Sequence, residues 1–305
     1  MVSLKEYIER AVNEKFALGA MNFNNMESLQ GIAEACKDER SPAIISVSEG
    51  ALAYMGDEYT LALVAAAKKI HPQLFLHLDH GKSLEICKKA INMGFDSVMI
   101  DGSALPFEEN IKLTAEVCKA AHNKGVLVEG ELGQIKGIED NVEAAEHHYT
   151  DPEKAKIFVE RTNVDMLAVA IGTSHGAYKY SGEKTLRFDI LEKIEALLPK
   201  TPLVLHGASN VCDELVADFN RYGGELIEAS GIPEELLQKA VREHNIVKIN
   251  TDTDIRLAMT AETRRVLSEN KNEFDLRKFL GAGRERVRSI ISEKIRNIFY
   301  SNNKI

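Results

Sequence analysis

The segment Leu74–Gly81, LFLHLDHG, contains the pattern that decides the fold: a short apolar run that ends in polar side chains. Two later segments repeat it, MLAVAIGTSHG at residues 166–176 and PLVLHGAS at residues 202–209. Short runs of Val, Ile and Leu between turn residues are typical of buried parallel strands. Residues just beyond the carboxyl ends of parallel strands line the active site of α/β proteins. We therefore expect the histidines that end these three runs to lie close together.

Strand-like and helix-like segments alternate along the chain, which predicts an α/β protein. Strands are expected at Leu18–Phe23, Ala43–Val47, Leu74–Leu78, Ser97–Ile100, Val126–Gly130, Met166–Ile171, Leu203–Leu205 and Ile246–Ile249. Helices are expected at Glu27–Glu39, Glu58–Ile70, Leu84–Met93, Phe107–Asn123, Pro152–Thr162, Arg187–Leu198, Glu234–Glu243 and Asp254–Asn270. This count and order predict a closed (β/α)8 TIM barrel, with an open doubly wound sheet as the alternative.

The 305 residues, 44% of them hydrophobic, suffice for one large core, so we expect a single barrel domain over residues 1–305. Further helices are predicted at the N-terminus, in an extended seventh connection around Asp213–Tyr222, and in a C-terminal helical extension over residues 275–305. Because barrels with such extensions commonly associate, we expect a homodimer or homotetramer.

The composition argues against several classes of partner. The net charge of −9 is not offset by any basic run, which disfavours nucleic acid. No apolar run approaches the roughly 20 residues that cross a bilayer, so we expect no membrane association. The N-terminal segment lacks the apolar core of a signal peptide. Cys36, Cys87, Cys118 and Cys212 show no close pairing, which predicts reduced, structural thiols and a cytoplasmic location.

The three strand-end histidines, His80, His175 and His206, predict a metal site. Three imidazoles that leave a position open for substrate suit catalytic zinc, although imidazole also suits cobalt, iron and nickel. The alternative is three separate core histidines. His77 is expected in the core or in support of the site. The remaining histidines fall on helices or loops and are expected at the surface: His71, His122, His147, His148 and His244.

Polar residues stand at the ends of all eight predicted strands: Asn22, Ser48, Asp79 with His80, Asp101, Glu131, His175, His206 and Asn250. Such a series predicts a site built from many loops. Asp79 either orients a metal-bound ring or transfers a proton. Asp101 and Glu131 could hold a second metal position or the ligand histidines, and Asp101 could equally be a helix or turn cap.

Three turns have the composition of anion-binding segments: Gly172–Gly176, Gly207–Ser209 and Asn250–Thr253. The last two follow the seventh and eighth strands, where barrels usually bind phosphate. Helix capping by Ser209 or Thr251 is the competing interpretation. A long polar segment, Gly133–Tyr149, has the length of a mobile lid, but its charges, including Glu139 and Asp140, favour a solvated loop on composition alone.

With these residues assembled, the sequence resembles the class II, metal-dependent fructose-bisphosphate aldolases over nearly its whole length. The shared motifs, in family order, are GAMNFNN, VSEGA, HLDHG, MIDGS, EGELG, GIEDN, AIGTSHGAYK, LHGAS and KINTDTD. The insertion Asn210–Ser230, together with TDTDIR, resembles the class IIB branch.

The resemblance implies a role for each group of residues. Catalytic Zn2+ would be held by His80, His175 and His206, with a second divalent position at Asp101 and Glu131. Asp79 would handle the proton of the C4 oxygen and Glu139 the C3 proton. Substrate contacts are implied for Asn22, Ser48, Gly176, Lys179, Gly207, Ala208, Ser209, Asn250, Thr251, Asp252 and Thr253. A monovalent cation, Na+ or K+, would assist phosphate binding.

The implied reaction is the reversible cleavage of fructose 1,6-bisphosphate to dihydroxyacetone phosphate and glyceraldehyde 3-phosphate, in glycolysis and gluconeogenesis. Tagatose-1,6-bisphosphate aldolase, with the same mechanism, is the main alternative. A zinc-dependent TIM-barrel hydrolase is disfavoured, because Asn22 stands where such enzymes carry a His-x-His pair. The class IIA arginine for the second phosphate is replaced by Gly281, which leaves Arg256, Arg277 or Lys179 as candidates.

Overall fold

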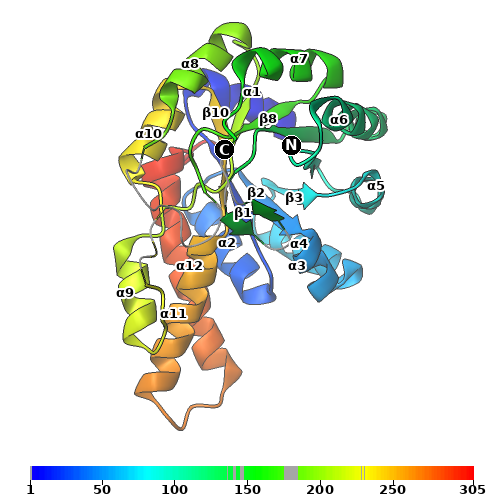
Figure 1. Cartoon of the computed structure of the whole chain (residues 1–305). Helices are drawn as coiled ribbons and strands as arrows, with labels where there is room; N and C mark the ends of the chain where they lie inside the picture. The colour runs from blue at the N-terminus through cyan, green and yellow to red at the C-terminus, as the bar shows by residue number, and fades with distance from the viewer. Residues whose placement is uncertain are drawn as a thin grey trace.

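The structure is a computed structural model that describes residues 2–135, 137–139, 142–144, 148–174, 185–227, 229 and 231–305, with the backbone alone for 137–139 and 142–144. Eight parallel strands close into a barrel in the order β1-β10-β9-β8-β5-β4-β3-β2. Helices surround this barrel (Figure 1). The predicted (β/α)8 fold is therefore confirmed, and the open-sheet alternative is wrong.

The barrel strands all follow the predicted order. They are β1 (Leu18–Asn22), β2 (Ala43–Ser48), β3 (Leu74–Gly81), β4 (Ser97–Ile100), β5 (Leu127–Leu132), β8 (Met166–Val169), β9 (Leu203–Leu205) and β10 (Ile246–Thr251). A separate antiparallel pair, β6 (Gly137–Glu139) and β7 (Val142–Ala144), lies in the segment that composition alone assigned to a solvated loop.

The helices also agree closely with prediction. They are α1 (Leu4–Glu14), α2 (Met26–Asp38), α3 (Glu49–Met55), α4 (Asp57–Ile70), α5 (Leu84–Met93), α6 (Phe107–His122), α7 (Pro152–Thr162), α8 (Phe188–Leu197), α9 (Asp213–Arg221), α10 (Glu234–Glu243), α11 (Thr253–Glu269), α12 (Leu276–Lys294) and the π-helical turn η1 (Ile295–Phe299). Helix α3 was not predicted. It begins after Ser48, whose hydroxyl accepts a hydrogen bond from the backbone N–H of Ala51 at 3.2 Å.

Four strands run further than predicted, so that several polar residues expected just beyond the strands lie inside them. Ser48 pairs with Asp79 across β2 and β3, and Glu131 pairs with Ala168 across β5 and β8. Backbone hydrogen bonding in a parallel ladder does not depend on the polarity of the side chain. The polar side chains are consequently held by the barrel itself rather than by loops.

The end of the barrel opposite the site is closed by apolar residues. Helix α1 contributes Leu4, Tyr7 and Ile8 to a buried cluster with interior side chains of the strands, among them Phe75 and Met166. A capping box between Ser3 and Glu6 fixes the start of this helix. Helix α1 therefore packs against the interior side chains at this end of the barrel.

The C-terminal helices connect distant parts of the chain. Figure 1 shows α11 and α12 projecting from the barrel as an arm, with α9 alongside. At the tip of this arm Phe274 is 88% exposed and Leu276 63% exposed. Beyond α12, η1 covers β1: the backbone N–H of Ala17 donates to the Phe299 carbonyl at 2.8 Å. A Cβ atom on Gly19 would lie 2.5 Å from the Phe299 ring, so only glycine fits beneath it.

Two histidines predicted at the surface are buried instead. The Nε2 atom of His71 lies 2.8 Å from the Ser41 carbonyl, and burial lowers the pKa of this ring although the hydrogen bond opposes the shift. His244 stacks on Phe188, with ring centroids 5.1 Å apart, and its Nδ1 lies 3.0 Å from Glu195. Both rings follow helices, but each replaces its lost hydration with a hydrogen bond.

The four cysteines are free thiols, as predicted, and three of them are buried. Among the described residues no helix is long and apolar enough to cross a membrane.

Burial predicts low thiol reactivity. It raises the pKa of Cys87 and Cys118 to about 12 and that of Cys36 further still, so these thiols stay protonated near neutral pH. At about pH 8 we expect a chromogenic disulfide reagent to react quickly with half-buried Cys212 alone. The unfolded protein, as control, should release four equivalents. Fast reaction of two or more thiols in the folded protein would contradict the structure.

Candidate metal centre and active site

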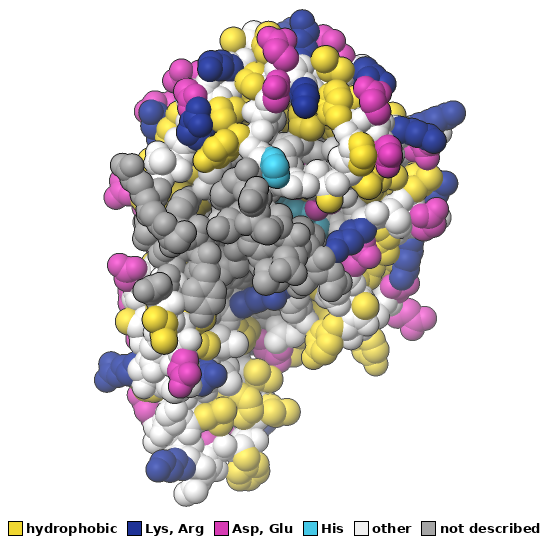
Figure 2. Space-filling model, in the orientation of Figure 1, with side chains coloured by type: hydrophobic (Ala, Val, Ile, Leu, Met, Phe, Trp, Pro, Cys, Tyr) yellow, Lys and Arg dark blue, Asp and Glu magenta, His cyan; other side chains and the backbone are white. Residues whose placement is uncertain are grey.

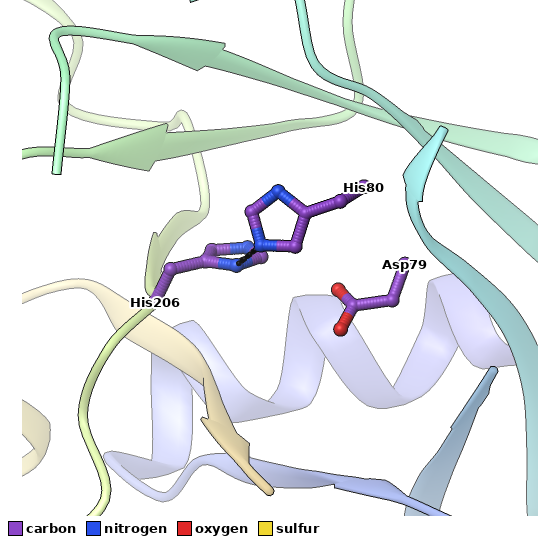
Figure 3. A group of neighbouring side chains, drawn as sticks. All are labelled: Asp79, His80 and His206. Carbon is purple, nitrogen blue, oxygen red and sulfur yellow. Dashed lines mark hydrogen bonds between the residues drawn. The ribbon is translucent and has the colours of Figure 1, made fainter. Parts of the chain in front are cut away.

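The site lies at the carboxyl end of the barrel, where β3 directs two adjacent side chains inward. Successive residues of a regular strand face opposite sides. His80 departs from this rule because its backbone has φ +48° and the pairing of β3 with β4 shifts register between Leu78 and Gly81. Figure 3 shows the side chains of Asp79 and His80 beside the same space, with His206 entering from the end of β9. A left-handed histidine is uncommon, and strain of this kind concentrates at functional sites.

His80 and His206 face each other through one nitrogen each. The Nε2 atom of His80 lies 3.0 Å from Nδ1 of His206, and the rings are close to perpendicular at 74°. Each outer nitrogen meets a carboxylate: His80 Nδ1 lies 3.0 Å from Asp101, and His206 Nε2 lies 2.5 Å from Glu129. Because carboxylates only accept hydrogen bonds, the outer nitrogens carry the protons. The inner lone pairs therefore converge, with the Asn250 amide donating to Nδ1 of His206 at 3.1 Å, and the space between them suits a shared proton or a shared cation.

The electrostatics around His80 favour a cation. Burial lowers the pKa of His80, but the carboxylates of Asp79, Asp101 and Glu131 outweigh it and raise the pKa well above its usual value. Burial and the Asp101 carboxylate raise the pKa of Glu131, and its Oε2 atom is buried without a hydrogen-bond partner among the described residues. His206 has a lowered pKa because of burial, which keeps it neutral as a ligand must be. This donor set fits a divalent metal ion.

Potential ligand atoms form two overlapping groups. Asp79, His80 and His206 have such atoms within 4.8 Å of one another, and so do His80, Asp101 and Glu131. His80 belongs to both groups. Asp101 also accepts hydrogen bonds from the N–H and hydroxyl of Ser103, at 3.1 and 2.7 Å. Asp101 therefore accepts hydrogen bonds from the turn at Ser103 and also contacts the His80 ring.

Asp79 is held through both of its carboxylate oxygens. The amide of Asn22 donates to Oδ2 at 2.8 Å, and the amide of Asn250 donates to Oδ1 at 2.9 Å. Figure 3 shows the carboxylate turned toward the two imidazoles. Asp79 is 1% exposed, so bulk water does not disturb this arrangement. The carbonyl oxygens of both amides are buried and have no partner among the described residues.

Two described residues of the turns with anion-binding composition, Gly207 and Thr251, have closely packed surroundings. Gly207 has φ +58°, and a Cβ atom there would lie 2.7 Å from the Ser174 backbone. The Oγ1 atom of Thr251 is buried without a partner among the described residues. Helix capping by Ser209 or Thr251 is wrong, because α9 begins after Cys212 and α11 after Asp252.

Comparison with known proteins identifies the family. A profile of the family described as "Fructose-bisphosphate aldolase class-II" matches residues 2–304. The chain belongs to the class-II fructose-bisphosphate aldolase family. The fructose-bisphosphate aldolase of Treponema pallidum is 45% identical over 99% of this chain and 96% of its own length. That of Thermus caldophilus is 48% identical over 97% of both chains. The solved YdjI aldolase of Escherichia coli K12 is 32% identical, with a TM-score of 0.79 over 100% of this chain and 99% of that one.

Several predicted residues of this class-II aldolase lie outside the described residues: His175, Gly176 and Lys179. The backbone of Glu139 belongs to β6, but its side chain is not described. Figure 2 shows histidine and acidic side-chain atoms in a hollow near the middle of the visible face, with basic and acidic side chains interspersed around it.

The two described candidates for the second phosphate differ in position. Arg256 forms a two-point ion pair with Asp252, the residue after β10, through contacts of 2.9 and 2.8 Å. The side chain of Arg277 is 90% exposed and pairs with Asp275 at the start of α12, on the projecting arm. Of these two arginines, Arg256 is the one that lies near the carboxyl end of a barrel strand.

Sequence reasoning missed two buried charged residues beneath the site, Glu129 and Lys248. Each interrupts an apolar strand, in VLVEGEL and in IVKIN, two positions before a predicted site residue. Alternate residues of a strand share a face, so this spacing indicates that Glu129 and Lys248 point into the barrel on the same side as the site residues.

The metal centre predicts a ligand-dependent gain in stability. With Zn2+ at about 100 times its Kd, we expect the free energy of unfolding to rise by about 2.7 kcal/mol, seen as a higher Tm. In His80→Gly, whose glycine tolerates the positive φ, the gain should disappear. His122→Ala removes a ring bonded to Asp165 away from the site and is the matched control. An equal Zn2+ effect in His80→Gly would exclude His80 as a ligand.

Proposed function

We propose that this class-II aldolase catalyses the zinc-dependent, reversible cleavage of fructose 1,6-bisphosphate to dihydroxyacetone phosphate and glyceraldehyde 3-phosphate, as in glycolysis and gluconeogenesis. The observation that carries the proposal is the cluster of Asp79, His80 and His206 at the open end of the barrel. Near full-length identity of 45% and 48% to relatives named for this substrate supports it.

In this proposal His80 and His206 bind the divalent ion together with His175, and Asp101 and Glu131 offer a second position. A bound Zn2+ supplies Lewis-acid stabilisation of the negative charge that develops on the substrate carbonyl oxygen, a contribution of several kcal/mol. The carboxylates behind the rings keep both imidazoles in the tautomer that can bind a cation.

Asp79 is assigned the acid/base step at the C4 oxygen. Its buried carboxylate is held from both sides by the amides of Asn22 and Asn250, so as the carboxylate it would accept the C4 hydroxyl proton during cleavage. In the direction of synthesis it returns that proton to the new alkoxide. Glu139, carried on the β6–β7 pair, is assigned the proton at C3. The lid function of this segment is part of the same proposal.

The phosphate groups are assigned to the turns around the rim. We propose Gly176, Gly207, Ala208, Ser209, Asn250, Thr251, Asp252 and Thr253 for the dihydroxyacetone phosphate end, with Na+ or K+ in support. Ser48 lies beside Asp79 in the ladder, which supports its assignment to the substrate. Of the described candidates Arg256 is favoured for the second phosphate, because its ion pair with Asp252 holds it at the end of β10.

Two further assignments complete the proposal. Reduced, buried thiols support a cytoplasmic protein. Exposed Phe274 and Leu276 on the arm support a homodimer or homotetramer of single-domain subunits.

Replacement of the acid/base group tests the mechanism. Asp79→Ala should lower kcat for cleavage by about 10²–10⁴-fold, because the C4 proton loses its acceptor, while His80 and His206 remain to hold metal. Cleavage rates and zinc content by elemental analysis are measured on the same preparation. Asp38→Ala, an exposed carboxylate paired with Arg288, serves as control. Near-normal turnover by Asp79→Ala would remove Asp79 from this role.

A coupled cleavage assay on both ketose bisphosphates tests the substrate. We expect a higher kcat/KM for fructose 1,6-bisphosphate than for tagatose 1,6-bisphosphate, and loss of activity in EDTA that returns with Zn2+. Borohydride with substrate should trap no adduct, because no lysine stands at the end of the sixth predicted strand. A preference for the tagatose substrate would reassign the enzyme, and activity that survives complete removal of metal would refute the mechanism.

A further inference from the structure

A fully buried polar layer lies inside the barrel directly beneath the metal centre. It contains Ser46, His77, Glu129 and Lys248, each 0% exposed. Each precedes a residue of the site by two positions, so that it shares the inward face of its strand. Branched apolar side chains normally fill the interior of such barrels. Charge at this depth is costly and needs an explanation beyond packing.

Glu129 connects this layer to the metal centre. Its Oε1 atom lies 2.5 Å from Nε2 of His206, and its Oε2 atom lies 2.8 Å from Nζ of Lys248. One carboxylate thus binds a histidine of the site with one oxygen and a buried ammonium with the other. The histidine of the layer, His77, has its Nε2 atom 3.8 Å from Oε2 of Glu129 and its Nδ1 atom 2.8 Å from the Ser97 hydroxyl.

The charges of the layer balance within the barrel. The ammonium of Lys248 lies 2.8 Å from Oε2 of Glu129, so the acidic and the basic group of the layer form one ion pair. Burial and Lys248 lower the pKa of His77 to about 3, which leaves that ring neutral. The remaining pair, Glu129 and Lys248, is neutral overall. Lys248 therefore keeps Glu129 anionic without adding net charge beneath the metal.

An anionic Glu129 determines which nitrogen of His206 faces the metal. A carboxylate can only accept, so His206 must carry its proton on Nε2 and present the lone pair of Nδ1 toward His80. We propose that Glu129, anchored by Lys248, is a positioning residue that fixes the orientation and tautomer of His206 and thereby sets the affinity of the site for its divalent ion. This inference rests on the proposed function, in which His206 is a metal ligand.

The variant Glu129→Gln separates positioning from packing. It preserves the shape of the side chain, but Lys248 attracts the amide oxygen and leaves the NH2 group facing His206. The ring must then accept on Nε2 and carry its proton on Nδ1, where a metal would bind. We expect the affinity for Zn2+ to fall by about 10–100-fold, the usual effect of losing a carboxylate behind a metal-bound histidine.

The measurement uses the full-length protein and metal alone. Zn2+ affinity is determined by competition with a chromophoric chelator, and Co2+ binding by its visible absorption spectrum, which reports ligand geometry. Far-UV circular dichroism of the metal-free protein reports folding. In Glu129→Gln we expect weaker Zn2+ binding and an altered Co2+ spectrum with unchanged circular dichroism. Ser46→Ala lies in the same layer, contacts neither histidine of the site by hydrogen bond, and should bind metal as the wild type does.

The double variant Glu129→Gln/Lys248→Met supplies a second test. Without the ammonium, the glutamine can turn its oxygen toward His206, so affinity should recover part of the loss. The double variant also removes both charges of the buried ion pair together, so it leaves no unpaired charge in the barrel. If Glu129→Gln does not fold, the double variant still tests the inference, because it should bind Zn2+ more weakly than the wild type. Wild-type affinity and spectrum in Glu129→Gln would overturn the inference. Failure of the wild-type protein to bind Zn2+ would instead refute the proposed metal centre.

Discussion

The two converging nitrogens of His80 and His206, 3.0 Å apart, are the constraint on which the rest of the site depends. Each ring has its proton committed to a carboxylate on the far side, so both lone pairs point into the space between the rings. The Asn250 amide donates to Nδ1 of His206 at 3.1 Å, and a cation between the two nitrogens would relieve the repulsion between the lone pairs. The acidic residues around His80 supply the matching field.

The charged groups of the site and the apolar residues that stabilise the fold lie at different depths in the barrel. At the closed end, helix α1 and the lower interior residues form an apolar plug with no need for charge. At the open end, the strands carry amide, hydroxyl and carboxylate groups inward. Between them lies the polar layer around Glu129 and Lys248, which belongs chemically to the site although no solvent reaches it. The apolar residues that stabilise the barrel, the buried polar layer and the site residues thus lie one above another along the barrel axis.

Much of the fold could be predicted because each strand is an apolar run and each helix has clear ends. Asn25, Ser83 and Asp151 cap helices where the sequence suggested that they begin. The convergence of His80 and His206 followed from equivalent positions at the ends of strands. The inward turn at His80 did not, since a positive φ in a histidine leaves no mark on composition.

Other features depended on contacts that sequence patterns do not report. The burial of His71 and His244 rests on partners far along the chain, a carbonyl at Ser41 and the Phe188 ring. The β6–β7 pair forms within a polar segment that has no apolar alternation to announce it. The sequence did show that Glu129 is a charged residue inside an apolar run. Its role could not be inferred from that, because the sequence does not show that Lys248 lies next to it in the barrel.

The docking of η1 on β1 has a consequence for the order of assembly. The first strand pairs with the last, β10, and the Phe299 ring packs against it at Gly19. During synthesis β10 and η1 leave the ribosome long after β1. The edge of β1 that pairs with β10 therefore stays unpaired and prone to aggregation until the C-terminal segments have been made. Ribosome-bound nascent chains therefore carry an unprotected edge that chaperones would be expected to recognise.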